Sequence, residues 1–369
     1  MRHNVTRIVL TLAIFAVLVA GFGRELAGAV TYTIVQLSPN GEAWGIGGGQ
    51  QVGDLNSNGH AVYWNGTPAS AVDLQPLGFQ TSMAVGSTGT QQIGDAWTYR
   101  DSYPHAIVWS GTAASAVDLT PSGFDHSYGE GICGTQQVGY GMNASQQLHD
   151  HAFLWSGSAA SAVDLNPAGF TLSRAFGTNG AQQAGYGRGA VTGNQIHALL
   201  WSGTAASVID MHPAGLNESG FLGMCGTQFV GYGWEQSMTG RHAYVWNGTA
   251  ASAVDLHPAG YDWTEANATN GSVQVGYGVG AATGGQQHAM AWSGSAASAV
   301  DLQALLGPGF SYSHAQGIDD QGNIVGYAVD TSSCSHAIMW VPVPEPGTIV
   351  LLGIGVFGLM AWTRRQRRC

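Results

Sequence analysis

A histidine, a tryptophan and an aspartate recur together along this chain at a fixed spacing. The clearest copy reads HAFLWSGSAASAVDL, from His151 through Trp155 and Asp164. An imidazole beside a carboxylate could exchange a proton in acid–base catalysis or bind a metal ion. The phrase is repeated, however, along the whole chain. The histidines are His60, His105, His151, His197, His242, His288 and His336, and the tryptophans are Trp64, Trp109, Trp155, Trp201, Trp246, Trp292 and Trp340.

The repeated carboxylates do not form a recognisable metal site. They are Asp73, Asp118, Asp164, Asp210, Asp255 and Asp301, with Gln36 in the corresponding place of the first copy. Calcium takes roughly 6–8 converging oxygens, and zinc takes three or four ligands at ~2 Å. One aspartate and one histidine per copy do not supply such a set. We predict no metal and no cofactor, and a structural network in which each aspartate accepts turn N–H groups or meets the histidine and the indole N–H.

Catalytic motifs are also missing from the sequence. No Gly-x-Ser-x-Gly, His-Glu-x-x-His or phosphate-binding loop stands out. A catalytic group in a repeat protein should be singular, whereas the histidine, tryptophan and aspartate are plural. We therefore predict that the protein is not an enzyme.

The spacing of the repeat defines seven units. Successive tryptophans lie 45, 46, 46, 45, 46 and 48 residues apart. Thr33–Leu37 stands where Ala162–Leu165 stands later, so residues 31–341 hold seven complete units. Each unit predicts four short strands: Val-Asp-Leu, a polar strand such as Leu172–Phe176, Gln-Gln-Val-Gly-Tyr, and His-Ala-Phe-Leu-Trp.

Four strands in ~46 residues, repeated seven times, predict a seven-bladed β-propeller of four-stranded antiparallel blades. A β-solenoid is the alternative, but hairpin turns such as Asn179-Gly180 argue against it. We place Val-Asp-Leu as the first strand of each blade, so that the phrase runs from the last strand of one blade into the first strand of the next.

The repeat resembles the HAF family of bacterial extracellular repeats. The resemblance lies in His151-Ala152-Phe153, Trp155, Asp164-Leu165 and Gln137-Val138-Gly139. It implies export, and it brings no established catalytic residues.

The N-terminus predicts a secretory signal peptide over residues 1–29. Arg2 and Arg7 precede the apolar stretch Ile8–Ala20, and Ala27-Gly28-Ala29 is a small-residue cleavage site for signal peptidase. An uncleaved membrane anchor is the alternative. Residues 30–342 would then form the exported propeller.

The C-terminus, residues 343–369, carries a second signal. Pro344-Glu345-Pro346 is followed by the apolar run Gly347–Trp362, a predicted transmembrane helix, and by four arginines within residues 364–368. This order resembles the PEP-CTERM sorting signal. The resemblance implies transient anchoring in the inner membrane, processing by an exosortase, and delivery to the surface or extracellular matrix of a Gram-negative bacterium.

Charge and cysteine content exclude further classes. The segment between the two termini has only four arginines and no lysine, so it lacks the basic surface that nucleic acid requires. Cleavage of the tail would leave Cys133, Cys225 and Cys334, an odd number that cannot form a complete disulfide set. We interpret Cys133 and Cys225 as turn residues.

Ligand binding is predicted where the units differ. Strand parity places the loops between the first and second strands, and between the third and fourth strands, on one face, and the sequence varies in these loops. The candidate binding residues are Trp97, Tyr99, Arg100, His126, Arg188, Trp234 and Trp263. Exposed aromatic side chains suit a polysaccharide or a matrix protein. The alternatives are a purely structural matrix component and a propeller glycan lyase or hydrolase, and the three tryptophans must share a face for the prediction to hold.

Overall fold

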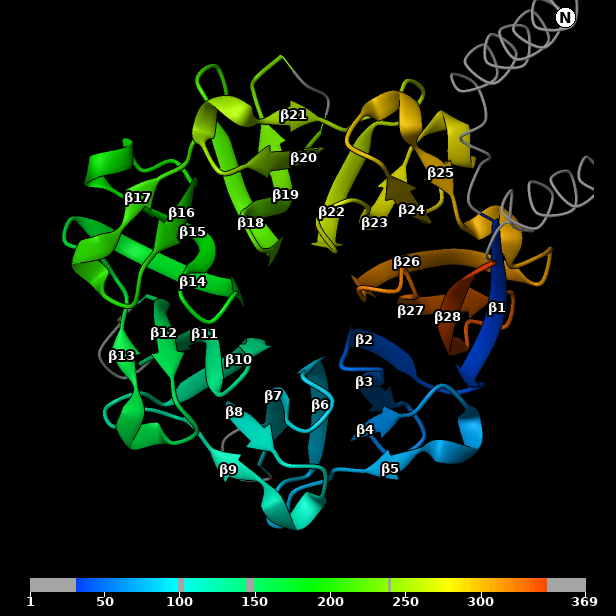
Figure 1. Ribbon diagram of the computed structural model, residues 1–369, viewed down its shortest axis with the longest axis horizontal. Helices are drawn as coiled ribbons and strands as arrows, with labels where there is room; N and C mark the ends of the chain where they lie inside the picture. Colours follow the sequence, from blue (N-terminus) through cyan, green and yellow to red (C-terminus); the bar gives the residue numbers. More distant parts are fainter. Residues whose placement is uncertain (1–30, 99–102, 144–148, 238–239, 344–369) are drawn as a thin grey trace, which may run out of the picture. The chain divides into compact units, whose positions relative to one another are not determined.

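The structure is a computed structural model, and it describes residues 31–98, 103–143, 149–237 and 240–343. Residues 33–341 form one compact unit. The strands of this unit make seven four-stranded antiparallel sheets around a central axis (Figure 1). The prediction of a seven-bladed all-β propeller is confirmed.

Each blade has an inner, a second, a third and an outer strand, counted from the axis. The inner strands are β2 (Glu42–Gly47), β6 (Thr81–Ser87), β10 (His126–Cys133), β14 (Phe170–Thr178), β18 (Glu218–Cys225), β22 (Trp263–Thr269) and β26 (Phe310–Ile318). The second strands are β3 (Gln50–Leu55), β7 (Gln92–Trp97), β11 (Gln136–Met142), β15 (Gln183–Gly189), β19 (Gln228–Trp234), β23 (Gln274–Val279) and β27 (Ile324–Asp330).

The third strands carry the repeated histidine and tryptophan. They are β4 (His60–Trp64), β8 (Pro104–Trp109), β12 (His151–Trp155), β16 (His197–Trp201), β20 (His242–Asn247), β24 (His288–Trp292) and β28 (Ser335–Val343). The outer strands are β5 (Val72–Asp73), β9 (Val117–Asp118), β13 (Val163–Asp164), β17 (Ile209–Asp210), β21 (Val254–Asp255), β25 (Val300–Asp301) and β1 (Thr31–Ser38).

Short 3-10 turns are the helical elements that the structure assigns within the described residues. Six follow third strands: η1 (Pro68–Ser70), η2 (Ala113–Ser115), η4 (Ala159–Ser161), η6 (Ala205–Ser207), η7 (Ala250–Ser252) and η9 (Ala296–Ser298). The others are η5 (Ala190–Thr192), η8 (Ala281–Thr283) and η10 (Gln303–Leu305). Within the described part of the chain, none of these is long and apolar enough to cross a membrane. The predicted signal peptide, the Pro344-Glu345-Pro346 motif and the predicted C-terminal helix lie outside the described residues.

The strand order corrects the predicted start of each blade. In the third blade, β13 pairs with the strand that precedes it, with Phe153 opposite Asp164. The intervening turn is tight because Ser161 Oγ accepts the Ser156 N–H at 2.8 Å, so the chain returns alongside the strand it has just left. Val-Asp-Leu is therefore the outer strand of its own blade, and the prediction that it opens the next blade is wrong.

The N-terminal strand closes the ring. The last sheet has the order β1-β28-β27-β26, and Gln36 Nε2 lies 2.8 Å from His336 Nδ1. Thr33–Leu37 thus takes the place that Val-Asp-Leu takes in the other blades, as its alignment with Ala162–Leu165 predicts. Because strands from both ends of the repeat region share one blade, the ring has no open end.

The repeated tryptophans fill the spaces between blades. All seven are fully buried. Trp201 of the fourth blade packs against Ala152, Leu154 and Leu165 of the third. A buried aromatic side chain is among the largest contributors of apolar area, so the tryptophans stabilise the contact of each blade with its predecessor.

Hydrogen bonds also join neighbouring blades. The Ser173 hydroxyl of an inner strand accepts the Ala152 N–H of the preceding blade at 3.0 Å and donates to Asn166 Oδ1 at 2.8 Å. The equivalent hydroxyls that accept this alanine N–H belong to Ser82, Ser127, Ser219, Thr264 and Ser313. The His-Ala phrase and the serine of the following inner strand therefore act as one unit of the fold.

All seven inner strands share a β-bulge at the same place, and β14 and β26 have a second one near their start. In β10 the register with β11 shifts between Gly129 and Gly131, which takes Glu130 out of the regular pairing. The equivalent residues of the other blades are Trp44, Val85, Phe176, Leu222, Asn267 and Gln316. We call these seven positions the bulge residues. A bulge redirects a side chain, and all seven bulge residues line the central cavity.

The residue after the bulge is glycine in six of the seven blades. A Cβ atom on Gly131 would lie 2.5 Å from the carbonyl oxygen of Phe176, and one on Gly223 would lie 2.4 Å from that of Asn267. Glycine at this position therefore lets the inner strands of adjacent blades approach closely around the axis.

Candidate functional site

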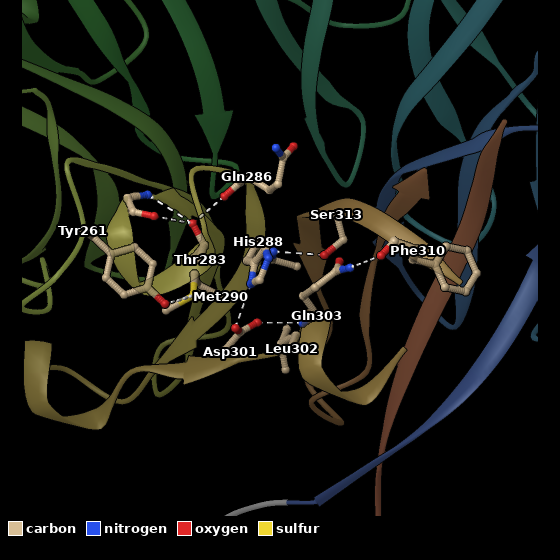
Figure 2. A network of polar contacts seen from close by, with 12 residues as sticks. Tyr261, Thr283, Gln286, His288, Met290, Asp301, Leu302, Gln303, Phe310 and Ser313 are labelled. Atoms are coloured by element: carbon tan, nitrogen blue, oxygen red, sulfur yellow. Dashed lines mark hydrogen bonds and ion pairs between the residues drawn. The ribbon is translucent and has the colours of Figure 1, made fainter. Parts of the chain in front are cut away.

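The repeated aspartates join the outer strand of a blade to its third strand. Figure 2 shows the sixth blade, where His288 Nδ1 lies 2.8 Å from Asp301 Oδ2 and the other carboxylate oxygen accepts the Gln303 backbone N–H at 2.9 Å. Gln303 Nε2 in turn donates to the carbonyl of Phe310, in the inner strand of the seventh blade. Both oxygens of Asp301 thus have protein partners.

The same geometry recurs in five other blades. The histidine Nδ1 and the aspartate Oδ2 are 2.7 or 2.8 Å apart in the pairs His60–Asp73, His105–Asp118, His151–Asp164, His197–Asp210 and His242–Asp255. In the closing blade His336 lies between Gln36 and Asp330. The repeated histidines and aspartates therefore hold strands together in every blade.

The tryptophans do not join this network as predicted. The indole Nε1 atoms of Trp109, Trp155, Trp201, Trp246 and Trp292 are buried and have no hydrogen-bond partner in the described structure. Trp340 Nε1 instead donates to the backbone carbonyl of Leu302 at 3.3 Å. The predicted contact of indole N–H with aspartate is wrong, because the indoles point between blades while the aspartates lie at the outer strands.

The loops that vary in sequence share one end of the blades. In each blade the connection from the preceding outer strand runs beside the loop between the second and third strands, as shown by the backbone bonds Gln80–Trp97, Asn217–Trp234 and Asp262–Val279 at 2.7–2.8 Å. We call this end of the propeller the variable face. Trp97 and Trp234 end second strands and Trp263 begins an inner strand, so the three tryptophans lie at the same end.

Trp97 borders a hollow on the variable face. The hollow has a volume of about 370 Å³ and is lined by Gln80, Thr81, Trp97 and Thr98. It combines one half-buried indole ring with amide and hydroxyl groups. Arg188, another predicted residue, is exposed at the same end of the fourth blade.

The structure places the other predicted residues differently. His126 is only 6 % exposed, and its ring lies 3.7 Å from that of Tyr103, tilted by 55°, so its prediction as an exposed loop residue is wrong. Trp263 has a buried indole nitrogen and lies 5.8 Å from the Arg241 guanidinium. Tyr99 and Arg100 lie outside the described residues.

The central cavity is the feature that sequence reasoning missed. It has a volume of about 410 Å³ and is lined by the second halves of all seven inner strands. The seven bulge residues around it are all different and comprise two aromatic, two aliphatic, two amide and one carboxyl side chain, although the neighbouring positions repeat. In the sequence, this one variable position among repeated neighbours was the signal for a cavity. It could be recognised only after the structure showed that the bulge turns this position toward the axis.

Carboxyl groups near the cavity have unusual surroundings. Burial raises the pKa of Glu130 to about 7, although Arg174 opposes the shift. Burial also raises the pKa of Asp95 well above its ordinary value, with a further contribution from Glu130. Asp54 Oδ1 accepts a hydrogen bond from the indole N–H of Trp44 at 2.8 Å. Burial raises the pKa of Asp54 to about 6.

Asp54 and Asp95 occupy a position that is tyrosine in the other blades. That position holds Tyr140, Tyr186, Tyr232, Tyr277 and Tyr327 in second strands. Arg174 lies 4.4 Å above the Tyr140 ring and donates from Nε to Asp150 at 2.7 Å. This position of the second strand is therefore acidic in the first two blades and aromatic in the other five.

No group of three or more His, Cys, Asp or Glu side chains within the described ranges is arranged to hold a metal ion. Cys133, Cys225 and Cys334 are free thiols. Cys133 and Cys225 end inner strands of the third and fifth blades, directly before hairpins.

Comparison with known proteins identifies the C-terminal signal. Residues 342–366 match the PEP-CTERM protein-sorting motif, which indicates an exported, cell-surface protein that an exosortase processes. No curated protein matches the chain.

Solved structures share the fold at low identity. The β-propeller domain of the Trilobed protease from Pyrococcus furiosus, described as having an open velcro topology, is 7 % identical, with 84 % of this chain and 95 % of that chain covered and a TM-score of 0.51. A structure from a study of two prolyl endopeptidases is 8 % identical, with 86 % and 51 % covered and a TM-score of 0.52.

TolB from Acinetobacter baumannii is 11 % identical, with 60 % of this chain and 53 % of that chain covered and a TM-score of 0.42. This chain therefore spans about half the length of TolB and of the prolyl endopeptidase. The likeness to the two structures with TM-scores above 0.5 shows the fold alone at these identities. The chain combines a seven-bladed β-propeller with a PEP-CTERM sorting motif.

Proposed function

We propose that this protein is a non-catalytic component of the cell surface or extracellular matrix, and that its variable face binds a polysaccharide or another matrix protein. The observation that carries the binding proposal is the hollow at Trp97. An indole ring can stack on the apolar face of a sugar, while Gln80 and Thr81 offer amide and hydroxyl groups to sugar hydroxyls. Arg188 adds an exposed cation on the same face.

We also propose that the repeat is of the HAF type and that the protein is delivered to the exopolysaccharide of a Gram-negative bacterium. The residues that carry the resemblance support it, because His151, Trp155 and Asp164 all serve contacts that the propeller needs within and between blades. The sorting motif supports the destination.

Two other functions remain alternatives. A purely structural matrix component would need the ring and no ligand. A glycan lyase or hydrolase would need a lone acid–base pair, and the raised pKa of Glu130 in the central cavity is the observation that favours it. The repeated histidine–aspartate pairs do not favour catalysis, because their atoms hold strands together.

Glycan-array binding and polysaccharide pull-down with the purified full chain test the proposal. We expect retention of at least one extracellular polysaccharide, and loss of retention in Trp97→Ala, with smaller losses in Trp234→Ala and Trp263→Ala. Thr90→Ala is the matched control, because Thr90 is exposed in the same blade at the opposite end.

Unchanged retention in Trp97→Ala would contradict a site at the hollow. Absence of binding to every polysaccharide and matrix protein tested would favour the structural alternative. Turnover of any glycan would overturn the assignment as non-catalytic.

A further inference from the structure

We propose that the central cavity is a second binding site, which takes one uncharged sugar residue such as a hexose or an N-acetylhexosamine. Its volume of about 410 Å³ lies within the usual range for small-molecule sites. It is built from inner strands and shares no lining residue with the hollow at Trp97. The two sites can therefore be tested separately.

The side chains of the cavity wall differ from blade to blade, although the backbone of the blades repeats. The bulge residues are, in blade order, Trp44, Val85, Glu130, Phe176, Leu222, Asn267 and Gln316, and all are half-buried. The bulge itself is present in every blade, so the backbone presents seven equivalent positions with seven different side chains. This is the pattern expected where a symmetric scaffold surrounds an asymmetric ligand.

Two aromatic bulge residues offer apolar faces. Trp44 is held in place because its Nε1 donates to Asp54 Oδ1 at 2.8 Å, and its ring lies 5.5 Å from that of Tyr327. Phe176 lies 5.3 Å from the Tyr186 ring. Rings fixed by their neighbours can stack on the C–H face of a sugar with little loss of side-chain entropy.

An amide pair supplies a donor and an acceptor. Asn267 Nδ2 donates to the Ala315 carbonyl and to Gln316 Oε1, both at 3.0 Å. Among the described residues, none donates a hydrogen bond to Asn267 Oδ1 and none accepts one from Gln316 Nε2. Both amides line the cavity, so one sugar hydroxyl could donate to the first atom and another could accept from the second.

The charges of the wall exclude an anionic sugar. Glu130 and Glu265 line the cavity, and none of the arginines and histidines that the structure describes does so. A carboxylate accepts hydrogen bonds from adjacent hydroxyls but repels a uronate. Arginines lie behind the wall: Arg241 is 3.9 Å from Glu265, and Arg174 lowers the pKa of Glu130 against the effect of burial. Arg174 also binds Asp150, and Arg241 also contacts Glu218, so the arginines offset the wall carboxylates only in part. Burial raises the pKa of both Glu130 and Glu265, so proton uptake relieves their charge and the ligand needs no positive charge.

Saturation-transfer NMR and calorimetric titration of the purified full chain test this site. The probes are methyl glucoside and N-acetylglucosamine as uncharged sugars, with glucuronate and glucosamine as the charged counterparts. We expect an uncharged sugar to bind, glucuronate not to bind, and Glu130→Gln to weaken binding about tenfold or more, because one carboxyl oxygen is replaced by an amide NH2 that cannot accept a hydrogen bond. Asp320→Asn is the control, since Asp320 is an exposed carboxylate outside the lining.

Val85→Trp provides a second variant that fills the cavity without removing a polar group. It should abolish binding of the uncharged sugar and leave polysaccharide retention at the Trp97 hollow unchanged. The proposal is overturned if neither uncharged sugar binds the folded wild-type protein, if a charged sugar binds more tightly than both, or if Val85→Trp binds like wild type. Loss of polysaccharide retention in Trp97→Ala with sugar binding intact would separate the two sites.

Discussion

His314 should make the stability of the propeller depend on pH between about 4 and 6.5. Its side chain is only 8 % exposed and lies between Tyr277 and Tyr327, with ring centroids 4.2 and 4.9 Å away. Nε2 lies 2.8 Å from Gln287 Oε1. Burial lowers the pKa of His314 to about 4, because the imidazolium would be desolvated between two rings.

The direction of the effect follows from proton binding. Below pH 6.5 the unfolded chain binds a proton at His314 before the folded protein does, so the free energy of unfolding falls as pH falls from 6.5 toward 4. At about 1.4 kcal/mol per pH unit, the whole interval corresponds to about 3.5 kcal/mol, and the part between pH 6.5 and pH 5 to about 2 kcal/mol.

Denaturant unfolding of wild type and His314→Phe at pH 7.5 and pH 5.0 measures this contribution. Phenylalanine keeps the stacking between the tyrosines and cannot bind a proton. We expect wild type to lose about 2 kcal/mol more than the variant on acidification. Carboxyl groups with raised pKa values, such as Asp54 and Glu130, have the opposite pH dependence, so the difference between the two proteins is the quantity of interest.

His149→Phe serves as the control because His149 is exposed. It should lose as much stability on acidification as wild type does. Equal losses in wild type and His314→Phe would refute the reasoning, since the imidazole would then bind its proton equally well in the folded and unfolded states.

Three further predictions concern stability. Asp95→Asn should be more stable than wild type at pH 8 and similar at pH 4, because burial raises the pKa of Asp95 and ionisation of Asp95 above pH 4 destabilises the fold. Thermal unfolding of both proteins at the two pH values checks this prediction, and equal melting temperatures at pH 8 would contradict it. Trp201→Ala should cost about 3–5 kcal/mol, since a fully buried indole leaves a cavity between two blades; a loss under 1 kcal/mol in urea unfolding would mean that the blades repack. Asp164→Asn should lower the free energy of unfolding by about 1 kcal/mol or less. The ion pair with His151 is lost at a partly exposed site, while the amide oxygen can still accept the Asn166 N–H. A loss above 3 kcal/mol in urea unfolding would show that the pair is more important to the blade than its exposure indicates.

The features of this fold that depend on consecutive residues were predictable from the sequence, and most of those that depend on long-range contacts were not. Spacing, strand period and turn residues were enough to predict seven four-stranded units and the sheet class, because these are properties of ~46 consecutive residues. The place of Thr33–Leu37 in the last blade also followed from alignment of the units, with Gln36 standing for the aspartate. The shared face of Trp97, Trp234 and Trp263 needed only strand parity.

The start of a blade could not be found in the same way. A cyclic repeat has no origin, so Val-Asp-Leu fits the sequence equally well as the strand before or after a blade boundary. The structure decides because β13 pairs with β12. Likewise, the pattern predicted His126 in an exposed loop, whereas in the structure it begins the inner strand β10, is buried and lies against Tyr103.

The candidate site shows the same division. From the sequence alone, Glu130, Asn267 and Gln316 are three unrelated polar residues in three different units. Their convergence depends on the bulge that turns one residue per blade to the axis and on the ring that brings the seven bulges together. The sequence by itself determined the repeated unit and its hydrogen-bonding phrase, because these are local. Only the tertiary structure decided which non-repeated side chains surround the cavity, because residues of separate blades meet only once the ring has closed.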